Sequence, residues 1–416
     1  MFGLFGKKKD KEAQPVIYAR ADHCISRKNI DPDALRVLYR LSHFGYTAYL
    51  VGGGVRDLLL GRTPKDFDVG TSAKPNEVKR VFRNCFLVGR RFRLAHVRFG
   101  QKVIETATFR QNSQTVGEII EHAAEMMGDD SLKPLEDNTF GTPETDAYRR
   151  DFTVNGLFYN IKDFSVIDWV GGMKDLQKRI IRSIGDPLIR FREDPVRMMR
   201  AIKFSARLDF KIEKKTEKAI RELHSCITTA STPRLCEEIF RLFTYGFSEK
   251  AFRMLYDFGL MGDLLPDLAK FIDEDGGMKS ATWKYLETLD RYERAMQERG
   301  IEVSNGLRAA VLHVAMAKRA PGHARDVMGT MLRAIKIPKA VYFSAVLMLD
   351  SIRRFSQPPR GRSRFVHNRD FPDMLDFNRI IARTEGRDEK ILDQWDELSR
   401  KMCNEQGAKH DRQEEH

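Results

Sequence analysis

The pattern of hydrophobic and polar positions changes about two fifths of the way along the chain. In the first part, residues 32–44 carry apolar side chains at helical spacing, and Gly45 follows as a C-cap before the strand-like run 47–51. A second helix is predicted near 75–82. The β-rich runs 95–99 and 102–109 flank Gly100-Gln101, a pair suited to a hairpin turn. These signals predict mixed α and β structure to about residue 165.

The remainder of the chain has a different period. Residues 111–147 are rich in Gly, Asp, Pro and Asn, so we expect a loop or insertion with one short helix at 117–127. Beyond Gly171-Gly172, long segments repeat at 3.6-residue spacing and few β-rich runs appear. We therefore predict an α+β fold: a mixed-sheet N-terminal part followed by helices, with a disordered end over residues 401–416.

Composition narrows the class of protein. The chain has 416 residues, 42% of them hydrophobic, which is enough for several cores. Lys and Arg exceed Asp and Glu by 72 to 59, so the net charge of +13 favours a polyanionic partner such as nucleic acid, although charge alone also fits a basic protein without one.

The cysteines and the hydropathy of the chain give information on its cellular compartment and on membrane contact. The five cysteines include no C-x-x-C pair, which favours reduced thiols and a cytoplasmic protein. We find no run of about 18 apolar residues and no secretory signal at the start. Residues 1–20 are expected to be a disordered basic tail, whose Phe2, Leu4 and Phe5 beside three lysines suggest a weak peripheral membrane contact.

A pair of carboxylates stands out in the segment "YLVGGGVRDLLLGRTPKDFDVGT" at 49–71. On a strand, Asp66 and Asp68 would project to one face about 7 Å apart, with Phe67 packing behind them. Such a pair can hold divalent metal against a nucleoside triphosphate. Most D-x-D pairs are solvated turn residues, so the motif alone is weak evidence.

Three glycines precede the carboxylates. A glycine run after an apolar strand lets the backbone approach phosphate oxygens, and Arg56 adds positive charge. The segment lacks the G-K-S/T of a Walker loop, and Asp57 stands where a dinucleotide fingerprint needs glycine. A tight turn that needs glycine only for its dihedral angles is the other interpretation.

A two-metal site needs a third carboxylate, and Glu105, which interrupts the strand 102–109, is the candidate.

Four motifs in order, "LVGGGVRDLLLG", "DFDVGT", "RRDFTVNGLFY" and "EDPVRMMRAIKFSARL", closely resemble the class II nucleotidyltransferase superfamily, which contains CCA-adding tRNA nucleotidyltransferases and bacterial poly(A) polymerases. The resemblance is strong over residues 25–245. The segment "LVGRRFRLAHVRFG" at 87–100 is similar to the polymerase branch. The resemblance therefore implies template-independent addition of AMP from ATP to RNA 3′ ends, with CCA addition to tRNA as the alternative.

The resemblance also assigns residues. It implies two Mg²⁺ ions bound by Asp66 and Asp68, with Glu105 as the third catalytic carboxylate. It gives Gly52, Gly53 and Arg56 to the triphosphate, and it associates a further set with the sugar and the organisation of the site: Arg150, Asp151 and Asn155.

Asp194 and Arg197 are three residues apart, hence neighbours on a helix, and the resemblance implies that they read the base. A carboxylate accepts and a guanidinium donates, which suits adenine and cytosine but opposes guanine and uracil. The choice between adenine and cytosine stays open. Asp194-Pro195 is also an ordinary helix start, with Asp as N-cap and Pro at the first position.

The resemblance divides the chain into a catalytic head at 21–165, a helical neck at 166–250 and an RNA-binding body and tail at 251–400. Five arginines among phenylalanines in 351–371 are the strongest candidates for RNA contact: Arg353, Arg354, Arg360, Arg362 and Arg364. A solvated connection between helices is the alternative. A catalytically silent RNA-binding protein is a third class, which the intact D-F-D and E-D-x-x-R motifs argue against. Protein partners are unknown.

Overall fold

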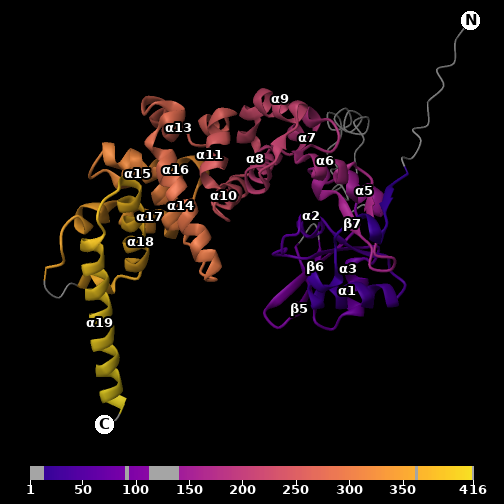
Figure 1. Ribbon diagram of the computed structural model, residues 1–416, viewed down its shortest axis with the longest axis horizontal. Helices are drawn as coiled ribbons and strands as arrows, with labels where there is room; N and C mark the ends of the chain where they lie inside the picture. Colours follow the sequence, from indigo (N-terminus) through magenta and orange to yellow (C-terminus); the bar gives the residue numbers. More distant parts are fainter. Residues whose placement is uncertain (1–13, 90–92, 112–139, 361–363, 415–416) are drawn as a thin grey trace, which may run out of the picture. The chain divides into compact units, whose positions relative to one another are not determined.

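The computed structural model describes residues 14–89, 93–111, 140–360 and 364–414, and it divides into two compact units, 1–187 and 188–416 (Figure 1). The first unit extends 22 residues beyond the head boundary predicted at 165, because β8 at Val166–Asp168 is a strand of its sheet.

The first unit is built on an eight-stranded mixed sheet in the order β1-β8-β7-β2-β3-β6-β5-β4. Strands β3 and β6 run parallel, and the other neighbouring strands are antiparallel. The strands are β1 (Val16–Tyr18), β2 (Ala48–Val51), β3 (Asp68–Thr71), β4 (Cys85–Val88), β5 (Leu94–Phe99), β6 (Lys102–Thr108), β7 (Leu157–Tyr159) and β8 (Val166–Asp168).

Two helices cover one face of this sheet. Helix α1 (Pro32–His43) contacts β2, β3 and β6, and α3 (Pro75–Val81) contacts β4, β5 and β6 (Figure 1). Asp31 caps α1 by accepting from the backbone N–H of Asp33, and Pro32 occupies the first turn. Both helices and the β5–β6 hairpin were predicted, and the structure confirms them.

The opposite face of the sheet has its own apolar cluster: Val51, Phe109, Ala147, Phe158 and Ile167. The other helical elements of the first unit are α2 (Gly53–Leu59), α5 (Pro143–Tyr148) and α6 (Gly172–Lys178), with 3₁₀ turns η1 (Arg20–Asp22), η2 (Arg27–Asn29) and η3 (Thr153–Asn155). Strand β9 (Ile180–Ile181) follows α6.

Two regions of the first unit differ from the prediction. Residues 16–18 form the edge strand β1, inside the segment 1–20 expected to be a disordered tail, because its β-branched and aromatic residues pair with β8. Helix α5 begins inside the expected loop 111–147, with Thr142 as its N-cap, and ends just beyond it at Tyr148. The short helix predicted at 117–127 and the membrane contact predicted for Phe2, Leu4 and Phe5 lie outside the described residues.

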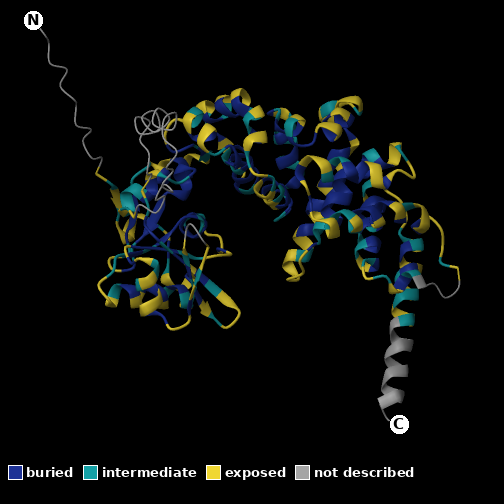
Figure 2. Ribbon diagram, turned by 180° about the vertical axis from the view of Figure 1, so that it is seen from behind, coloured by how far each residue is buried: buried dark blue, intermediate teal, exposed yellow. Residues whose placement is uncertain are grey.

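The second unit is almost entirely helical, as predicted, and many of its helices have one buried and one exposed side (Figure 2). The helices are α7 (Pro187–Glu193, which begins at the boundary), α8 (Val196–Leu208), α9 (Lys214–Leu223), α10 (Thr232–Arg241), α11 (Ser248–Asp257), α12 (Leu260–Leu264), α13 (Pro266–Glu274), α14 (Ala281–Glu298), α15 (Asn305–Arg319), α16 (Ala324–Ile335), α17 (Lys339–Phe355), α18 (Phe371–Glu385) and α19 (Lys390–Glu414). The remaining elements are β10 (Lys211–Ile212), η4 (His224–Thr229), η5 (Gly277–Lys279) and η6 (Arg364–His367).

The end of the chain differs from its prediction. Helix α19 continues to Glu414, through most of the segment 401–416 expected to be disordered. That segment contains no proline, and its one glycine, Gly407, costs a helix only about 1 kcal/mol relative to alanine. In the described part of the chain, no helix combines the length and the hydropathy that crossing a membrane requires.

Candidate functional site

The three glycines that follow β2 are Gly52, the N-cap of α2, and Gly53 and Gly54, its first two residues, and they differ in how strictly the structure requires glycine. Gly52 has φ +72°, and a Cβ there would lie 2.9 Å from Nη1 of Arg150, so both the backbone and the space require glycine. A Cβ on Gly54 would lie 3.3 Å from the carbonyl oxygen of Asp66, which is a tight contact. At Gly53 the nearest atom, Nη2 of Arg56, is at an ordinary 3.5 Å. The turn therefore needs glycine at Gly52, and the space at Gly54 is tight.

Arg56 lies buried beneath this turn, with only 2% of the residue exposed. Its Nε and Nη2 donate to one carboxylate oxygen of Asp57 at 2.8 and 2.7 Å, and Nη1 donates to Oδ1 of Asn155 at 2.6 Å. Nδ2 of Asn155 in turn donates to Asp151 at 3.1 Å. These contacts join the "GGGVRD" segment to the "RRDFTVN" segment and place Arg56 in the framework of the turn.

Arg150 is more exposed than Arg56, and its guanidinium lies next to Gly52 at the start of the turn. Its Nε and Nη2 donate to Oδ2 of Asp146 at 3.3 and 3.0 Å, and its guanidinium lies 5.1 Å from the ring centre of Phe158. It is the closest group to the Cβ position of Gly52, and its charge acts on Asp68. The structure therefore brings a cation next to the glycine turn and the carboxylates.

Asp68 and Glu105 come together because β3 and β6 are parallel neighbours. Val69 is the register partner of Thr106, so the preceding residues, Asp68 and Glu105, also lie side by side. Val69 and Thr106 are buried, which leaves Asp68 and Glu105 on the face opposite the α1–α3 layer. Nε2 of His96 on β5 lies 3.8 Å from Glu105, whose side chain is half exposed.

Asp66 is placed differently from the expectation. Strand β3 begins at Asp68, so Asp66 lies in the preceding loop and is exposed, and the two do not share a strand. The α2 N-terminus packs on the backbone of 66–67, as the Gly54 contact shows, and this contact fixes the loop. Within the described residues, no three His, Cys, Asp or Glu side chains are close enough to form a metal-binding group.

Burial and the neighbouring carboxylates raise the pKa of Asp68. Burial raises the pKa of Asp68 to about 6, and the charges of Glu105 and, to a smaller extent, Asp66 act in the same direction. The charge of Arg150 opposes the rise. An ionised Asp68 is therefore unfavourable here without additional positive charge, an environment that suits a cation ligand.

The second unit holds the other predicted site residues. Nε of Arg197 lies 3.9 Å from Oδ2 of Asp194, and the same oxygen accepts from Nη2 of Arg234 at 2.9 Å. Oδ1 of Asp194 is buried and accepts no hydrogen bond from any residue that the structure describes. A buried carboxylate oxygen without a donor costs free energy, so this atom is suited to accept from a ligand.

The helix start at this site is shifted from the prediction. Helix α8 begins at Val196 with Pro195 as its N-cap, and no side chain caps it. Asp194 therefore lies one position before the cap, and its carboxylate faces Arg234 and Arg197 instead of the helix N–H groups. The ordinary capping explanation for Asp194 does not hold.

Sequence reasoning missed three residues that organise these sites. Asp57 holds Arg56, Asp146 holds Arg150, and Arg234 holds Asp194. Only Asp57 carried a signal, because it adjoins Arg56 in a segment of buried apolar residues. Asp146 and Arg234 are positioned by α5 and α10, whose places relative to the site the sequence does not show.

The basic segment 351–371 is only partly available for RNA. Phe355, Phe365 and Phe371 pack with Trp395, with ring centres 5.4–6.5 Å apart, so these rings belong to the core of the unit. The guanidinium of Arg354 lies 4.3 Å from the Phe365 ring. Arg362 and the side chain of Arg364 lie outside the described residues.

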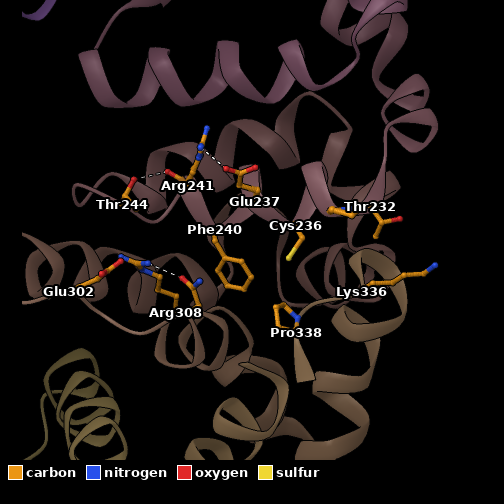
Figure 3. A pocket seen from close by; sticks show the side chains of 12 residues that line it. Thr232, Cys236, Glu237, Phe240, Arg241, Thr244, Glu302, Arg308, Lys336 and Pro338 are labelled. Carbon is orange, nitrogen blue, oxygen red and sulfur yellow. Dashed lines mark hydrogen bonds and ion pairs between the residues drawn. The ribbon is translucent and has the colours of Figure 1, made fainter. Parts of the chain in front are cut away.

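A separate pocket of about 510 Å³ lies in the second unit, between α10, the start of α15 and the α16–α17 connection (Figure 3). Cys236, Phe240 and Pro338 point into it. Its arginines are already paired: Arg241 with Glu237 and Glu238, and Arg308 with Glu293. The pocket is thus apolar with neutralised charges at its rim, and it contains none of the predicted site residues.

Comparison with known proteins gives two family matches. Residues 48–182 match the family described as "Poly A polymerase head domain". Residues 209–272 match "Probable RNA and SrmB- binding site of polymerase A". The first match contains the glycine turn, the three carboxylates and the "RRDFTVN" segment.

Individual relatives agree with these matches. The chain is 48% identical over 263 residues to poly(A) polymerase I of Escherichia coli O6:H1, covering 63% of this chain and 56% of that protein. It is 37% identical over 236 residues to a CCA-adding enzyme of Lactobacillus helveticus, covering 57% and 55%. The chain thus spans little more than half the length of these relatives.

A solved structure supports the fold. The Bacillus stearothermophilus CCA-adding enzyme in complex with CTP superposes with a TM-score of 0.65 at 27% identity, covering 90% of this chain and 83% of that chain.

Proposed function

We propose, from the premise that this chain belongs to the class II nucleotidyltransferase superfamily, that it is a poly(A) polymerase: it adds AMP from ATP to RNA 3′ ends without a template and releases pyrophosphate. The observation that carries the proposal is the placement of Asp68 and Glu105 on one face of neighbouring strands, beside the glycine turn and Arg150. The higher identity to poly(A) polymerases than to CCA-adding enzymes favours this activity.

The carboxylates fit a divalent cation, because Asp68 lies beside Glu105, and burial, followed by the charge of Glu105, raises the pKa of Asp68. We propose that Asp66 and Asp68 hold Mg²⁺ ions, two in number, with Glu105 as the third carboxylate. Bound Mg²⁺ would activate the attacking 3′ hydroxyl and neutralise the departing pyrophosphate. Asp66 would reach the ions from the loop that precedes β3, which the contact with Gly54 holds in place.

The triphosphate would lie against the glycine turn. Gly52 and Gly53 permit close approach of the backbone, and Arg150 supplies the charge at that point. Arg56 acts indirectly, because its buried guanidinium holds the turn through Asp57 and Asn155. Asp151 extends the same framework towards the sugar of the nucleotide through its bond from Asn155.

The base would be read by Asp194 and Arg197. The buried Oδ1 of Asp194 can accept from the amino group of adenine, and the guanidinium can donate to the adjacent ring nitrogen. Arg234 would hold the carboxylate in place from the other side. Cytosine presents the same pattern, so CCA addition is the alternative, favoured by the fold of the CTP-bound enzyme.

RNA 3′ ends are the second substrate. The net charge of +13 and the family match over 209–272 support an RNA-binding role for the helical part.

The absence of C-x-x-C pairs among the five cysteines supports a reducing, cytoplasmic setting.

One assay tests the activity. Purified protein, Mg²⁺ and each single nucleoside triphosphate are supplied with oligo(A) or with tRNA that lacks its terminal CCA. Long adenylate ladders on oligo(A) are expected with ATP. Addition that stops after one to three residues on tRNA would support CCA addition instead, and no addition with any nucleotide would contradict both.

A further inference from the structure

A groove of about 800 Å³ runs along the outer side of α1 and α3 in the first unit. Residues along α1, from Pro32 to His43, form one wall together with Phe44, and residues 81–84, with Phe99, form the other. It lies on the opposite side of the sheet from the carboxylates, because α1 and α3 cover the face to which Val69 and Thr106 point. The groove is therefore separate from the catalytic site.

The lining of the groove is positively charged. It includes Arg36, Arg40, Arg83 and His43, and none of its lining residues is acidic. Arg36 pairs with Asp33 at 3.0 Å, but Asp33 also pairs with Lys102, so this acid is shared between two cations. Arg83 is exposed and forms no ion pair with the described residues. The groove thus has an excess of positive charge directed at solvent.

Aromatic rings alternate with these cations. The guanidinium of Arg40 lies 5.5 Å from the ring centre of Phe44 and 5.7 Å from that of Phe82, and its Nε donates to the carbonyl oxygen of Val81 at 2.9 Å. This bond fixes Arg40 between the two rings. Phe44 is 53% exposed and Tyr39 43% exposed, unusually high values for such large rings.

A further contact between a ring and a guanidinium group lies at the sheet edge, next to the groove wall. Asn84, in the groove wall, donates to the carbonyl oxygen of Arg98. The Arg98 guanidinium lies 5.4 Å from the ring of Phe86, which is 56% exposed on the edge strand β4. Phe86 pairs with His96, and His96 pairs with Glu105, so this contact lies on the carboxylate face of the sheet and is not part of the groove.

We propose that this groove binds single-stranded RNA, the part of the chain upstream of the 3′ end that receives AMP. Exposed rings offer stacking surfaces to bases of any sequence, and the arginines offer charge to the phosphates between them. The inference rests on the proposed function for the identity of the RNA. Because the groove is separate from the carboxylates, it contributes RNA affinity without taking part in the transfer.

RNA fits the groove better than an acidic protein segment does. A peptide would need apolar side chains to fill the cleft and carboxylates to match the arginines, whereas every nucleotide supplies both a flat ring and a charge. The exposed rings of Tyr39 and Phe44 beside Arg36 and Arg40 match the base and the phosphate of a nucleotide.

The test measures RNA binding without ATP, so that it is independent of catalysis. The charge variant is Arg36→Glu with Arg83→Glu, and the control is Lys162→Glu with Lys178→Glu, the same charge change at exposed residues outside the groove. Affinity is measured by fluorescence anisotropy with oligo(A) of about 25 nucleotides and of about 5, the longer being beyond one ~4–16-nucleotide site.

The groove variant is expected to weaken binding of the long oligonucleotide about 10-fold relative to the control, and to reduce the slope of log affinity against log salt by about 1.4, or ~0.7 for each lost phosphate contact. Phe44→Ala should weaken binding about 5-fold or more, and Phe44→Tyr should restore it. Circular dichroism checks that each variant is folded.

Equal losses in groove and control variants would overturn the proposal, because they would show a general charge effect. Unchanged RNA affinity in the groove variants would overturn it as well, and would leave an acidic protein segment as the occupant. If wild-type protein binds RNA through the groove but transfers no AMP, the proposed function fails while this inference stands.

Discussion

The glycine turn of the first unit and the Asp194 region of the second unit both bury charge, but they neutralise it differently. Arg56 is fully enclosed and meets Asp57 and Asn155 at 2.6–2.8 Å. Asp194 meets Arg234 with one oxygen and leaves the other, buried oxygen without a donor among the described residues. The first region satisfies its buried charge by itself, whereas the second leaves an acceptor that the proposed nucleotide base would fill.

This difference separates two tasks. A surface that receives triphosphate must hold the same shape through each cycle, so an internal network that supports the turn is useful. A site that selects a base gains discrimination when the wrong base leaves buried polar groups unpaired. The predictions below test this distinction, beginning with the largest effect.

Arg56→Met should lower the free energy of unfolding by about 3–5 kcal/mol, because it leaves the carboxylate of Asp57 buried without its partner. Arg234→Met is the matched change beside Asp194, and it should cost no more than about 1 kcal/mol because the side chain of Arg234 is 53% exposed. Urea unfolding measures both. Equal losses of unfolding free energy in the two variants would show that the two regions do not differ in how they neutralise buried charge.

Gly52→Ala should destabilise the protein by about 2 kcal/mol or more, because alanine is strained at φ +72° and its Cβ would collide with Arg150. Gly53→Ala is the control, one residue along, and should change stability by less than about 1 kcal/mol, since its Cβ meets Arg56 at an ordinary distance. Thermal unfolding compares them. A Gly52→Ala protein as stable as the control would show that the turn is not constrained as described.

Arg197→Ala should reduce the preference for ATP over GTP by about 5- to 150-fold, corresponding to ~1–3 kcal/mol for the lost discrimination by a buried polar group. The preference is the ratio of kcat/KM for the two nucleotides with oligo(A). Arg200→Ala, the same change one turn further along α8, should leave that ratio in place. An equal fall of ATP and GTP incorporation in Arg197→Ala would exclude base reading.

Asp68→Asn should stabilise the metal-free protein at pH 7 by about 1–2 kcal/mol. The pKa of Asp68 is raised from 3.8 to about 6, so the folded state holds this proton more tightly than the unfolded state does. The carboxylate therefore destabilises the fold progressively as the pH rises from about 4 to 6, and fully above 6.

Thermal unfolding with a chelator, at pH 7 and below pH 4, measures this effect. The gain of Asp68→Asn should disappear below pH 4, where both states are protonated. Asp66→Asn, at an exposed position, is the control and should change little. A loss of stability in Asp68→Asn at pH 7 would mean that its charge is compensated within the fold.

The sequence predicted the local elements well, because helix spacing, caps and hairpin turns are encoded by neighbouring residues. Helix α1, strand β2 and the β5–β6 hairpin appear close to their expected limits. The sequence also indicated Asp68 and Glu105 as candidate carboxylates of the site. It did not show why they meet, since the parallel pairing of β3 and β6 joins residues 37 positions apart.

The errors have similar physical causes. Asp66 was assigned to a strand because alternation was assumed to begin before Asp68, whereas the packing of α2 at Gly54 holds that segment as a loop. Arg56 was expected to face the triphosphate, but its partner Asn155 comes from a segment 99 residues away and draws it beneath the turn. Whether a polar side chain supports the fold or faces a ligand depends on partners that are distant in the sequence.

The most direct measurement of the central claim is AMP transfer by Asp68→Asn, with Mg²⁺, ATP and oligo(A), alongside the affinity of the same protein for oligo(A). The account predicts that turnover falls at least about 10³-fold, because the carboxylate proposed to hold Mg²⁺ is lost, while RNA affinity changes less than about twofold. Turnover close to wild type would contradict the claim that these carboxylates form the catalytic site.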